Sequence, residues 1–206
     1  ASEFRYRDPI LNENTLMIII SQSGETADTL AALREAKRAG CRVLSVVNVV
    51  GSTIATESDD VLYTWAGPEI SVASTKAYST QLAVIYLLAL YIGEQLGKFT
   101  QEQLSAYIAA LEKLPEQIDE MLKHKENIQF FASKYFNASD MYFIGRNVDY
   151  AASLEASLKL KEISYIHSEA YAAGELKHGP ISLIEDGTLV IALATDARLF
   201  DKMMSN

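Results

Sequence analysis

The sequence predicts an α/β fold with parallel sheets, arranged as two units in tandem. A strand–turn–helix pattern occurs twice and carries this prediction, first from residues 15–20 and again from residues 141–146. In each case an apolar strand precedes a segment whose apolar residues have helical spacing, and further strands follow. Strands that alternate with helices form parallel sheets with right-handed crossovers. We expect the first unit at residues 1–98, and a helical connector with the second unit at residues 99–206.

The elements of the first unit follow from local patterns. The β-branched run Thr15–Ile20 predicts a strand that is buried on both faces, as strands of parallel sheets are. Helical spacing of apolar residues begins at Thr26 and is stopped by Gly40. The other elements expected here are strands at 41–47 and 60–66, a short helix at 52–58 and a long buried helix at 74–96.

The second half begins with a connector at 99–137, which is rich in Glu, Lys and Gln and has amphipathic helical spacing broken at Pro115. After it we expect a strand at 141–146, a helix at about 150–165, a loop rich in Glu, Ala and Gly, and a strand at 188–194. We expect both units to be truncated, the first before its opening strand and helix, the second in its carboxyl-terminal part.

The composition excludes several classes of function. The net charge of −9 argues against a broad surface for nucleic-acid phosphates. The longest apolar run, at 82–92, is shorter than the ~20 residues that span a bilayer. The single Cys41 cannot form an internal disulfide, and the histidines lack metal-motif spacings. We therefore expect no metal, cofactor, nucleic acid or membrane and, without an export signal, a cytoplasmic protein.

The turn Ser21-Gln22-Ser23-Gly24-Glu25-Thr26 is the first candidate binding site. It lies between a parallel strand and a helix N-terminus, where ligands of open α/β sheets bind and where free N–H groups favour an anion. Its hydroxyls and amide can add donors to phosphate oxygens, and Gly24 permits close backbone approach. Helix capping by Ser23 or Thr26 is the alternative, but it accounts for only one hydroxyl. We favour phosphate binding, without the Gly-Lys-Ser/Thr ending of a P-loop.

Three other sets of residues have both structural and chemical interpretations. Ser74 opens the long helix, where capping is the simpler role and ligand binding requires its loop to face the same crevice as Ser21. Glu155, Lys159 and Glu162 share one helix face, where spacing alone favours a structural ion pair, although a carboxylate beside a lysine can act as a base.

His178, in the run Gly174–Pro180, marks an abrupt helix stop. Interaction with the helix C-terminus is its simpler role. An imidazole is also the side chain best suited to proton transfer near neutral pH.

Longer motifs add a resemblance to a known family. The run 21–29 resembles the phosphosugar-binding loop of the sugar isomerase (SIS) domain family. The runs 72–77, 158–167 and 169–180 resemble the glutamine–fructose-6-phosphate aminotransferases, whose isomerase half contains two SIS domains. The resemblance covers essentially the whole chain. It implies tandem SIS-type three-layer αβα units with parallel sheets.

The resemblance also implies an activity and roles for individual residues. It implies an enzyme that binds fructose 6-phosphate and catalyses the ketose-to-aldose proton transfer that yields glucosamine 6-phosphate, in a homodimer whose parent chain carries a glutaminase domain. By the same resemblance, Glu162 is the base, Lys159 lies beside it, and His178 assists ring opening in the neighbouring subunit's site. The sugar phosphate is held by Ser21, Gln22, Ser23 and Thr26, and the sugar contacts Val72 and Ser74.

Two alternatives stay open. A SIS module could bind a phosphosugar without converting it, and a related deglycase could act on fructosamine phosphates. Glu162 and His178, each in a long motif, favour the enzyme over the binding module, because a sensor needs no proton-transfer pair. Release of glutamate from glutamine by the parent protein would separate the aminotransferase from the deglycase.

Overall fold

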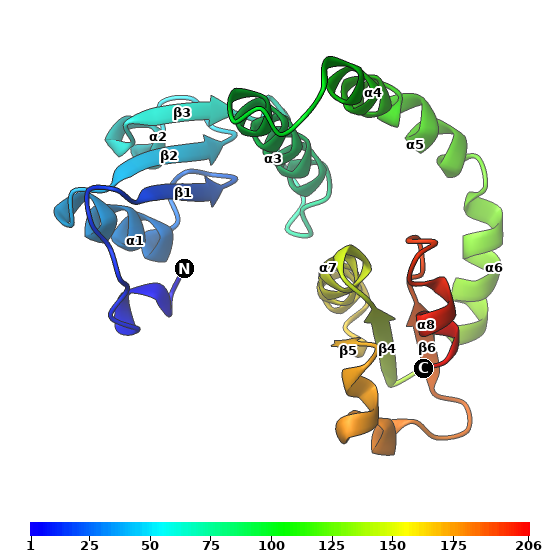
Figure 1. The fold of residues 1–206 in the computed structure, drawn as a ribbon. Helices are drawn as coiled ribbons and strands as arrows, with labels where there is room; N and C mark the ends of the chain where they lie inside the picture. Colours follow the sequence, from blue (N-terminus) through cyan, green and yellow to red (C-terminus); the bar gives the residue numbers. More distant parts are fainter. The chain divides into compact units, whose positions relative to one another are not determined.

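The structure, a computed structural model that describes residues 1–206, contains two compact units at residues 1–114 and 115–206 (Figure 1). Each unit has a three-stranded parallel sheet with helices between its strands, which confirms the predicted fold class. The expected boundary after residue 98 differs from the observed one because α4 (Gln101–Glu112) packs against α3 (Lys76–Gln95) and belongs to the first unit.

The first sheet has the order β1–β2–β3, with strands at Leu16–Ser21, Arg42–Val47 and Asp60–Tyr63. In the register of the sheet, Ser21 pairs with Val47 and Val47 pairs with Tyr63. The three strands therefore end level with one another, and the segments that follow them emerge along one edge.

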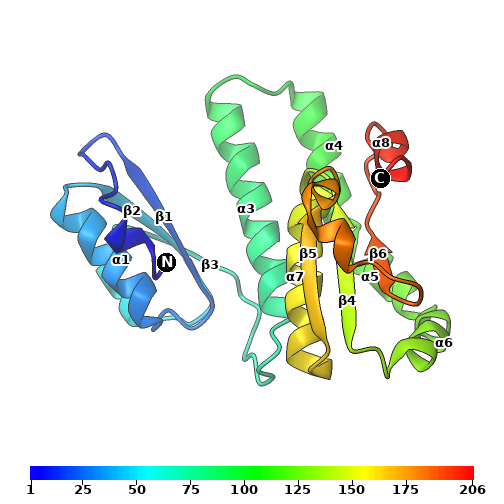
Figure 2. The same cartoon turned by 90° about the horizontal axis from the view of Figure 1, so that it is seen from below.

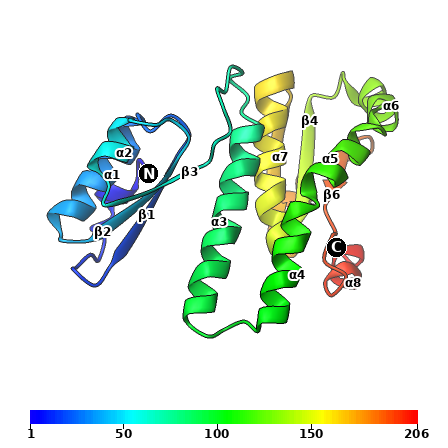
Figure 3. The same cartoon turned by 90° about the horizontal axis from the view of Figure 1, so that it is seen from above.

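Two helices cover one face of this sheet (Figure 3). They are α1 (Ala27–Arg38) and α2 (Thr53–Glu57), and their apolar residues form a core with the inward side chains of β1 and β2. Leu33 and Ile54 are completely buried in that core. The helix α1 ends where expected, because Gly40 adopts a φ of +81° that other residues rarely adopt.

Two expectations about burial in this unit are wrong. β1 is not buried on both faces, because it is an edge strand and helices cover only one side of it. Its outward residues Leu16, Ile18 and Ile20 are 48%, 40% and 45% exposed. The long helix α3 is present, but only Ala77 and Gly93 are buried, and several of its large apolar side chains, among them Leu87 and Tyr91, are exposed.

The connector consists of separate helices. The first, α4, begins with a capping box in which Thr100 and Gln103 exchange side-chain-to-backbone hydrogen bonds. It ends before Lys113, so the break precedes Pro115, which lies in the first turn of the next helix, where a missing N–H is tolerated. A further break separates the remaining two connector helices, α5 (Leu114–Leu122) and α6 (Lys125–Tyr135).

The second sheet has the order β5–β4–β6, with strands at His167–Ala172, Asp140–Gly145 and Leu189–Ala192 (Figure 2). The strand β5 contradicts the expectation of a loop in this region. It pairs with β4 along its whole length, from His167 opposite Asp140 to Ala172 opposite Gly145. Its sequence signal is weak, because the strand has no β-branched residue and Tyr171 is its single strongly strand-favouring side chain.

The helix α7 (Val148–Ser164) packs on β4 and β5 through small side chains. Ser153 and Ser157 are buried, and the hydroxyl of Ser157 lies 3.0 Å from that of Ser168 on β5. A Cβ at Gly145 would lie 2.4 Å from the backbone of Asp149, so this glycine permits the close approach of α7. The remaining elements are the short helices η1 (Phe4–Tyr6), η2 (Glu175–His178), η3 (Pro180–Leu183) and α8 (Phe200–Met204).

Candidate functional site

The turn at residues 21–26 joins the carboxyl end of β1 to α1 and is closed by its own hydroxyls. Ser21 Oγ accepts a hydrogen bond from the Gly24 N–H at 3.1 Å and lies 3.4 Å from Thr26 Oγ1. Ser23 Oγ accepts from the Glu25 N–H at 3.2 Å. Gly24 has a φ of +70°, in the left-handed region that favours glycine. The four predicted phosphate contacts, Ser21, Gln22, Ser23 and Thr26, therefore lie in one compact turn.

Neither hydroxyl proposed as a cap bonds the helix. Thr26 is the N-cap residue of α1, but its side chain accepts no hydrogen bond from the first turn. Ser23 bonds an amide of the turn rather than one of the helix. The capping alternative is wrong for both residues. The first N–H groups of α1 also have no acceptor within the helix, which leaves donors at this end for an anion.

The turn is attached to the segment that follows β2. The Asn48 N–H donates to the carbonyl oxygen of Gln22 at 3.2 Å, and the Ile54 N–H donates to that of Gly24 at 2.9 Å. The Thr53 N–H donates to Glu25 Oε1 at 2.7 Å. Hydrogen bonds from the backbone amide and the side chain of Thr53 lower the pKa of the Glu25 carboxyl.

Asn48 was missed by sequence reasoning, although it links two loops at this edge of the sheet. Its Oδ1 accepts from the Thr64 hydroxyl at 3.0 Å and from the Ala66 N–H at 2.9 Å. Its Nδ2 donates to the carbonyl oxygen of Gly67 at 2.7 Å. The available signal was its position, because Asn48 follows β2 as Gln22 follows β1.

Ser74 lies in the irregular segment between β3 and α3, and a glutamate determines its orientation. Ser74 Oγ donates to Glu69 Oε2 at 3.1 Å, and the Ala77 N–H donates to the same oxygen at 3.2 Å. The Ala77 amide, with smaller contributions from Ser74 and Lys76, lowers the pKa of Glu69. Glu69 rather than Ser74 therefore caps α3. Val72, the other predicted sugar contact, is 95% exposed.

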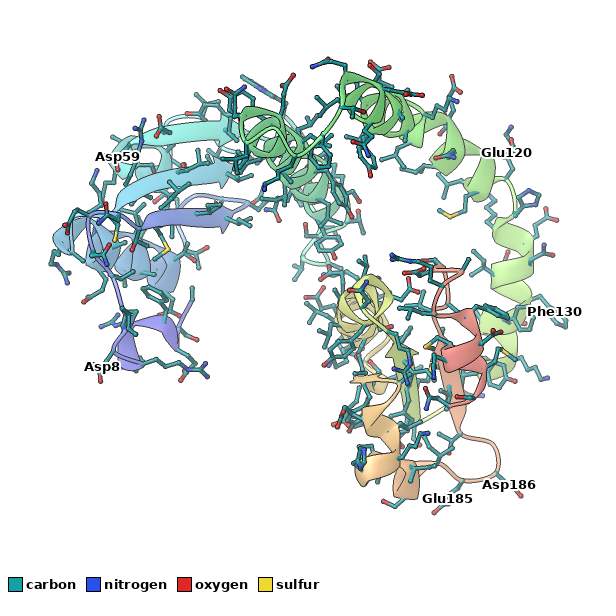
Figure 4. All side chains as sticks on the ribbon, in the orientation of Figure 1. Asp8, Asp59, Glu120, Phe130, Glu185 and Asp186 are labelled. Atoms are coloured by element: carbon teal, nitrogen blue, oxygen red, sulfur yellow. The ribbon has the colours of Figure 1, made fainter.

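The ion pairs of the first unit lie away from the turn. Asp59, at the amino-terminal end of β3 (Figure 4), accepts from Lys37 Nζ at 2.7 Å and from the Val43 N–H at 2.8 Å. Arg42 pairs with Asp60 at the same end of the strands, at 2.7 Å. Lys37 and Arg42 are therefore paired with carboxylates at the end of the sheet opposite the turn. An anion at the turn would be bound by neutral donors and the helix N-terminus instead.

In the second unit, α7 brings Lys159 between two carboxylates. Lys159 Nζ donates to Glu162 Oε2 and lies 3.7 Å from Glu155 Oε1. The three side chains are only 19–30% exposed. The predicted helical face is therefore present as a half-buried cluster with two negative charges and one positive charge.

His178 is the last residue of η2, and Gly179, with a φ of +134°, ends that helix as the sequence predicts. The imidazole is exposed and makes no hydrogen bond or ion pair within the chain. It is therefore accessible to a group that comes from outside the chain.

A buried carboxylate, also missed by sequence reasoning, joins α7 to the segment after β6. Asp149 is 6% exposed and accepts hydrogen bonds from the Thr195 hydroxyl at 2.5 Å and the Thr195 N–H at 2.8 Å. The Thr195 hydroxyl is the main cause of a lowered pKa for Asp149. This contact stabilises the start of the helix that carries Lys159 and Glu162.

Two negative findings concern the whole structure. No group of three or more His, Cys, Asp or Glu side chains is placed to hold a metal ion. No helix combines the length and the apolarity that crossing a membrane requires.

The sequence is similar to that of curated proteins along its whole length. Two relatives named glutamine–fructose-6-phosphate aminotransferase (isomerizing), from Caldanaerobacter subterraneus subsp. tengcongensis and Clostridium tetani, are 61% and 62% identical over 206 residues. The chain covers 34% of each, so it spans about a third of the length of these relatives.

A solved structure described as the C-terminal domain of glucosamine-fructose-6-phosphate aminotransferase from Francisella tularensis matches with a TM-score of 0.96 and 40% identity. That match covers 99% of this chain and 57% of the Francisella chain. The sequence profile of the SIS domain matches residues 1–91 and 134–206. On the basis of this match, which covers most of both α/β units, the chain belongs to the SIS domain family.

Proposed function

We propose that this chain is the isomerase part of a glutamine–fructose-6-phosphate aminotransferase. It binds fructose 6-phosphate and catalyses the ketose-to-aldose proton transfer that yields glucosamine 6-phosphate. The observation that carries the proposal is the closed turn at residues 21–26, at the carboxyl edge of a parallel sheet. Its occurrence in a chain that is 61–62% identical to aminotransferases of that name supports this substrate over other anions.

The phosphate of the sugar binds to the turn through uncharged donors. Gln22 supplies an amide, and Ser21, Ser23 and Thr26 supply hydroxyls, with the free N–H groups at the start of α1 behind them. Ser74 takes part as an acceptor toward a sugar hydroxyl, because its own proton is donated to Glu69. The backbone at Val72, in the same exposed segment, provides a second contact to the sugar.

Glu162 is the base that moves a proton between neighbouring carbons. With the imine formed from fructose 6-phosphate and ammonia, Glu162 takes a proton from C1, and the electron pair left behind forms the C1–C2 double bond while the nitrogen gains a proton. Glu162 then returns a proton to C2, and the hydroxyl on C1 loses its proton to become the aldehyde. One carboxylate can serve both carbons because they are adjacent. Lys159 orients this carboxylate by donating to it.

His178 opens the sugar ring by moving a proton from one oxygen to another. Its exposure and its lack of partners within the chain support a role toward a second copy of the chain, and we propose a homodimer in which it reaches the neighbouring site. We further propose that a glutaminase domain of the parent protein supplies the ammonia, since the chain spans only 34% of its relatives.

The test separates binding from proton transfer. Titration calorimetry measures the affinity for fructose 6-phosphate, and NMR in D₂O, with ammonium chloride added so that the imine can form, measures exchange of its C1 hydrogen. We expect Glu162→Gln to slow exchange by about 100-fold or more while the affinity changes less than about threefold. Glu155→Gln, which removes the other carboxylate near Lys159, is the matched control and should cost less than about tenfold in exchange.

Equal exchange rates in wild type and Glu162→Gln would contradict the role of the base. Binding without any exchange in the wild type would instead favour a SIS module that binds a phosphosugar without converting it.

A further inference from the structure

Glu25 is an unexpected residue for a turn that binds phosphate. A carboxylate near a phosphate dianion is repelled by it, so such a side chain should weaken binding unless it has another task. In this structure the carboxylate is bonded away from the turn, because Oε1 accepts the Thr53 N–H at 2.7 Å. The low pKa that Thr53 gives Glu25 is consistent with a carboxylate that is ionised when it makes this bond.

We propose that Glu25 is a positioning residue that holds the turn at residues 21–26 in its anion-binding shape by bonding the amide of Thr53. This inference rests on the proposed function, because it gives Glu25 a role in the phosphate site assigned there.

The contacts around Glu25 support this role. Two backbone hydrogen bonds, from Asn48 and Ile54, attach the carbonyl oxygens of Gln22 and Gly24 to the segment after β2. Among the bonds to this segment, those from Thr53 to the Glu25 carboxylate are the ones that use a side chain of the turn. Because these two carbonyl oxygens accept hydrogen bonds from the segment, the same bonds fix the backbone orientation of the turn and with it the orientation of its N–H groups.

The close packing beneath the turn makes its position sensitive to this attachment. A Cβ on Gly24 would lie 2.0 Å from Ser52 Oγ, which shows that the backbone of the turn is in contact with Ser52. Ser52 Oγ is buried and has no hydrogen-bond partner. Ser52 therefore makes contact without a directional bond, and Glu25 supplies the directional side-chain bond on the same side of the turn.

Two substitutions distinguish positioning from simple charge. Glu25→Ala removes the acceptor and the charge together, whereas Glu25→Gln keeps an oxygen that accepts from Thr53 and removes only the charge. If Glu25 positions the turn, Ala weakens phosphate binding by about tenfold and Gln restores it to within about twofold of wild type. If Glu25 only repels the ligand, both variants bind more tightly.

Asp28 offers a matched control. It is exposed, lies in the first turn of α1 and makes no hydrogen bond to the segment after β2. Asp28→Ala therefore removes a negative charge from the same region without loosening the turn. We expect it to leave the affinity unchanged or to raise it slightly.

The experiment is a calorimetric titration of the wild type and the three variants with fructose 6-phosphate and with inorganic phosphate, after circular dichroism has verified folding. Hydrogen–deuterium exchange of the peptide that contains residues 21–30 is measured on the same samples. Weaker binding and faster exchange in Glu25→Ala, both reversed in Glu25→Gln, are the expected results. If Glu25→Ala binds with the same affinity as the wild type, or if both Glu25 variants bind more tightly, the positioning role is overturned while the proposed function stands. Failure of the wild type to bind either compound would overturn the proposed function and, with it, this inference.

Discussion

Replacement of Gly24 by alanine tests how tightly the turn is held, and its cost can be worked from the structure. The new Cβ would lie 2.0 Å from Ser52 Oγ and 2.5 Å from Ser52 Cβ, closer than any ordinary contact. The φ of +70° adds a conformational cost of about 1–2 kcal/mol for a residue with a side chain. Overpacking of a buried contact adds about 1–3 kcal/mol. We expect Gly24→Ala to lower the free energy of unfolding of the first unit by about 3 kcal/mol in total.

Substitutions at Ser52 divide this cost into its two parts. Ser52→Ala keeps the Cβ at 2.5 Å and should relieve little, whereas Ser52→Gly removes the whole obstruction and should leave only the cost of φ. The double-mutant cycle is measured by urea denaturation, followed through the fluorescence of Trp65 and through circular dichroism. Trp65 reports on the first unit because it lies in that unit and is the only tryptophan of the chain.

We expect a coupling energy of about 1–2 kcal/mol between Gly24→Ala and Ser52→Gly, and a much smaller one with Ser52→Ala. If the unfolding free-energy changes of the single variants are additive in both cycles, the steric contact between Gly24 and Ser52 does not hold the turn, because the turn then moves away from Ser52 freely. Ser52→Ala alone should be nearly neutral or stabilising, since the hydroxyl that it removes is buried without a partner.

Two further predictions concern carboxylates with lowered pKa values. For Asp149, a folded-state pKa below the unfolded value means that its stabilisation is present above the unfolded pKa of about 3.9 and is lost as the pH falls through the folded value. Asp149→Asn should therefore destabilise the second unit by about 1 kcal/mol at pH 7, and by progressively less as the pH falls through the folded-state pKa, as measured by hydrogen exchange of peptides from α7. A difference that stays constant as the pH is lowered would contradict the role of the charge. For Glu69, replacement by Ala should speed amide exchange at residues 76–80, at the start of α3, severalfold. Glu69→Gln, which keeps an acceptor oxygen, should have a smaller effect. Equal exchange in the wild type and both variants would show that the hydrogen bond from Ala77 to Glu69 does not stabilise the start of the helix.

The regular elements of the first unit could be predicted because each has a strong local signal. The apolar run before Ser21, the helical spacing after Thr26 and the stop at Gly40 each reflect neighbouring residues only. The position of the turn at the carboxyl end of a parallel strand follows from the same signals. The exposure of Ile18 could not be predicted in this way, because it depends on which faces of the sheet have a covering helix.

The rest of the candidate site depends on contacts between residues far apart in the sequence. The bond from Thr53 to Glu25 joins positions 28 residues apart, and no local pattern distinguishes Glu25 from an ordinary exposed glutamate. β5 was missed because its residues have a poor strand propensity, which pairing with β4 overrides. In α7 the spacing of Glu155, Lys159 and Glu162 predicted their shared face, but only the structure shows Lys159 between the two carboxylates.

The arrangement of charges supports the proposal that the phosphate binds at the turn rather than at Lys159. A lysine is a common phosphate ligand, but here two carboxylates flank it, so the cluster carries a net negative charge and would repel a phosphate dianion. The turn has no cation, yet its only carboxylate is bonded to Thr53, and its hydroxyls and the start of α1 remain as donors. A cluster that repels phosphate while it holds a carboxylate in place is suited to proton transfer, and this supports separate roles for the two units: anion binding in the first and base chemistry in the second.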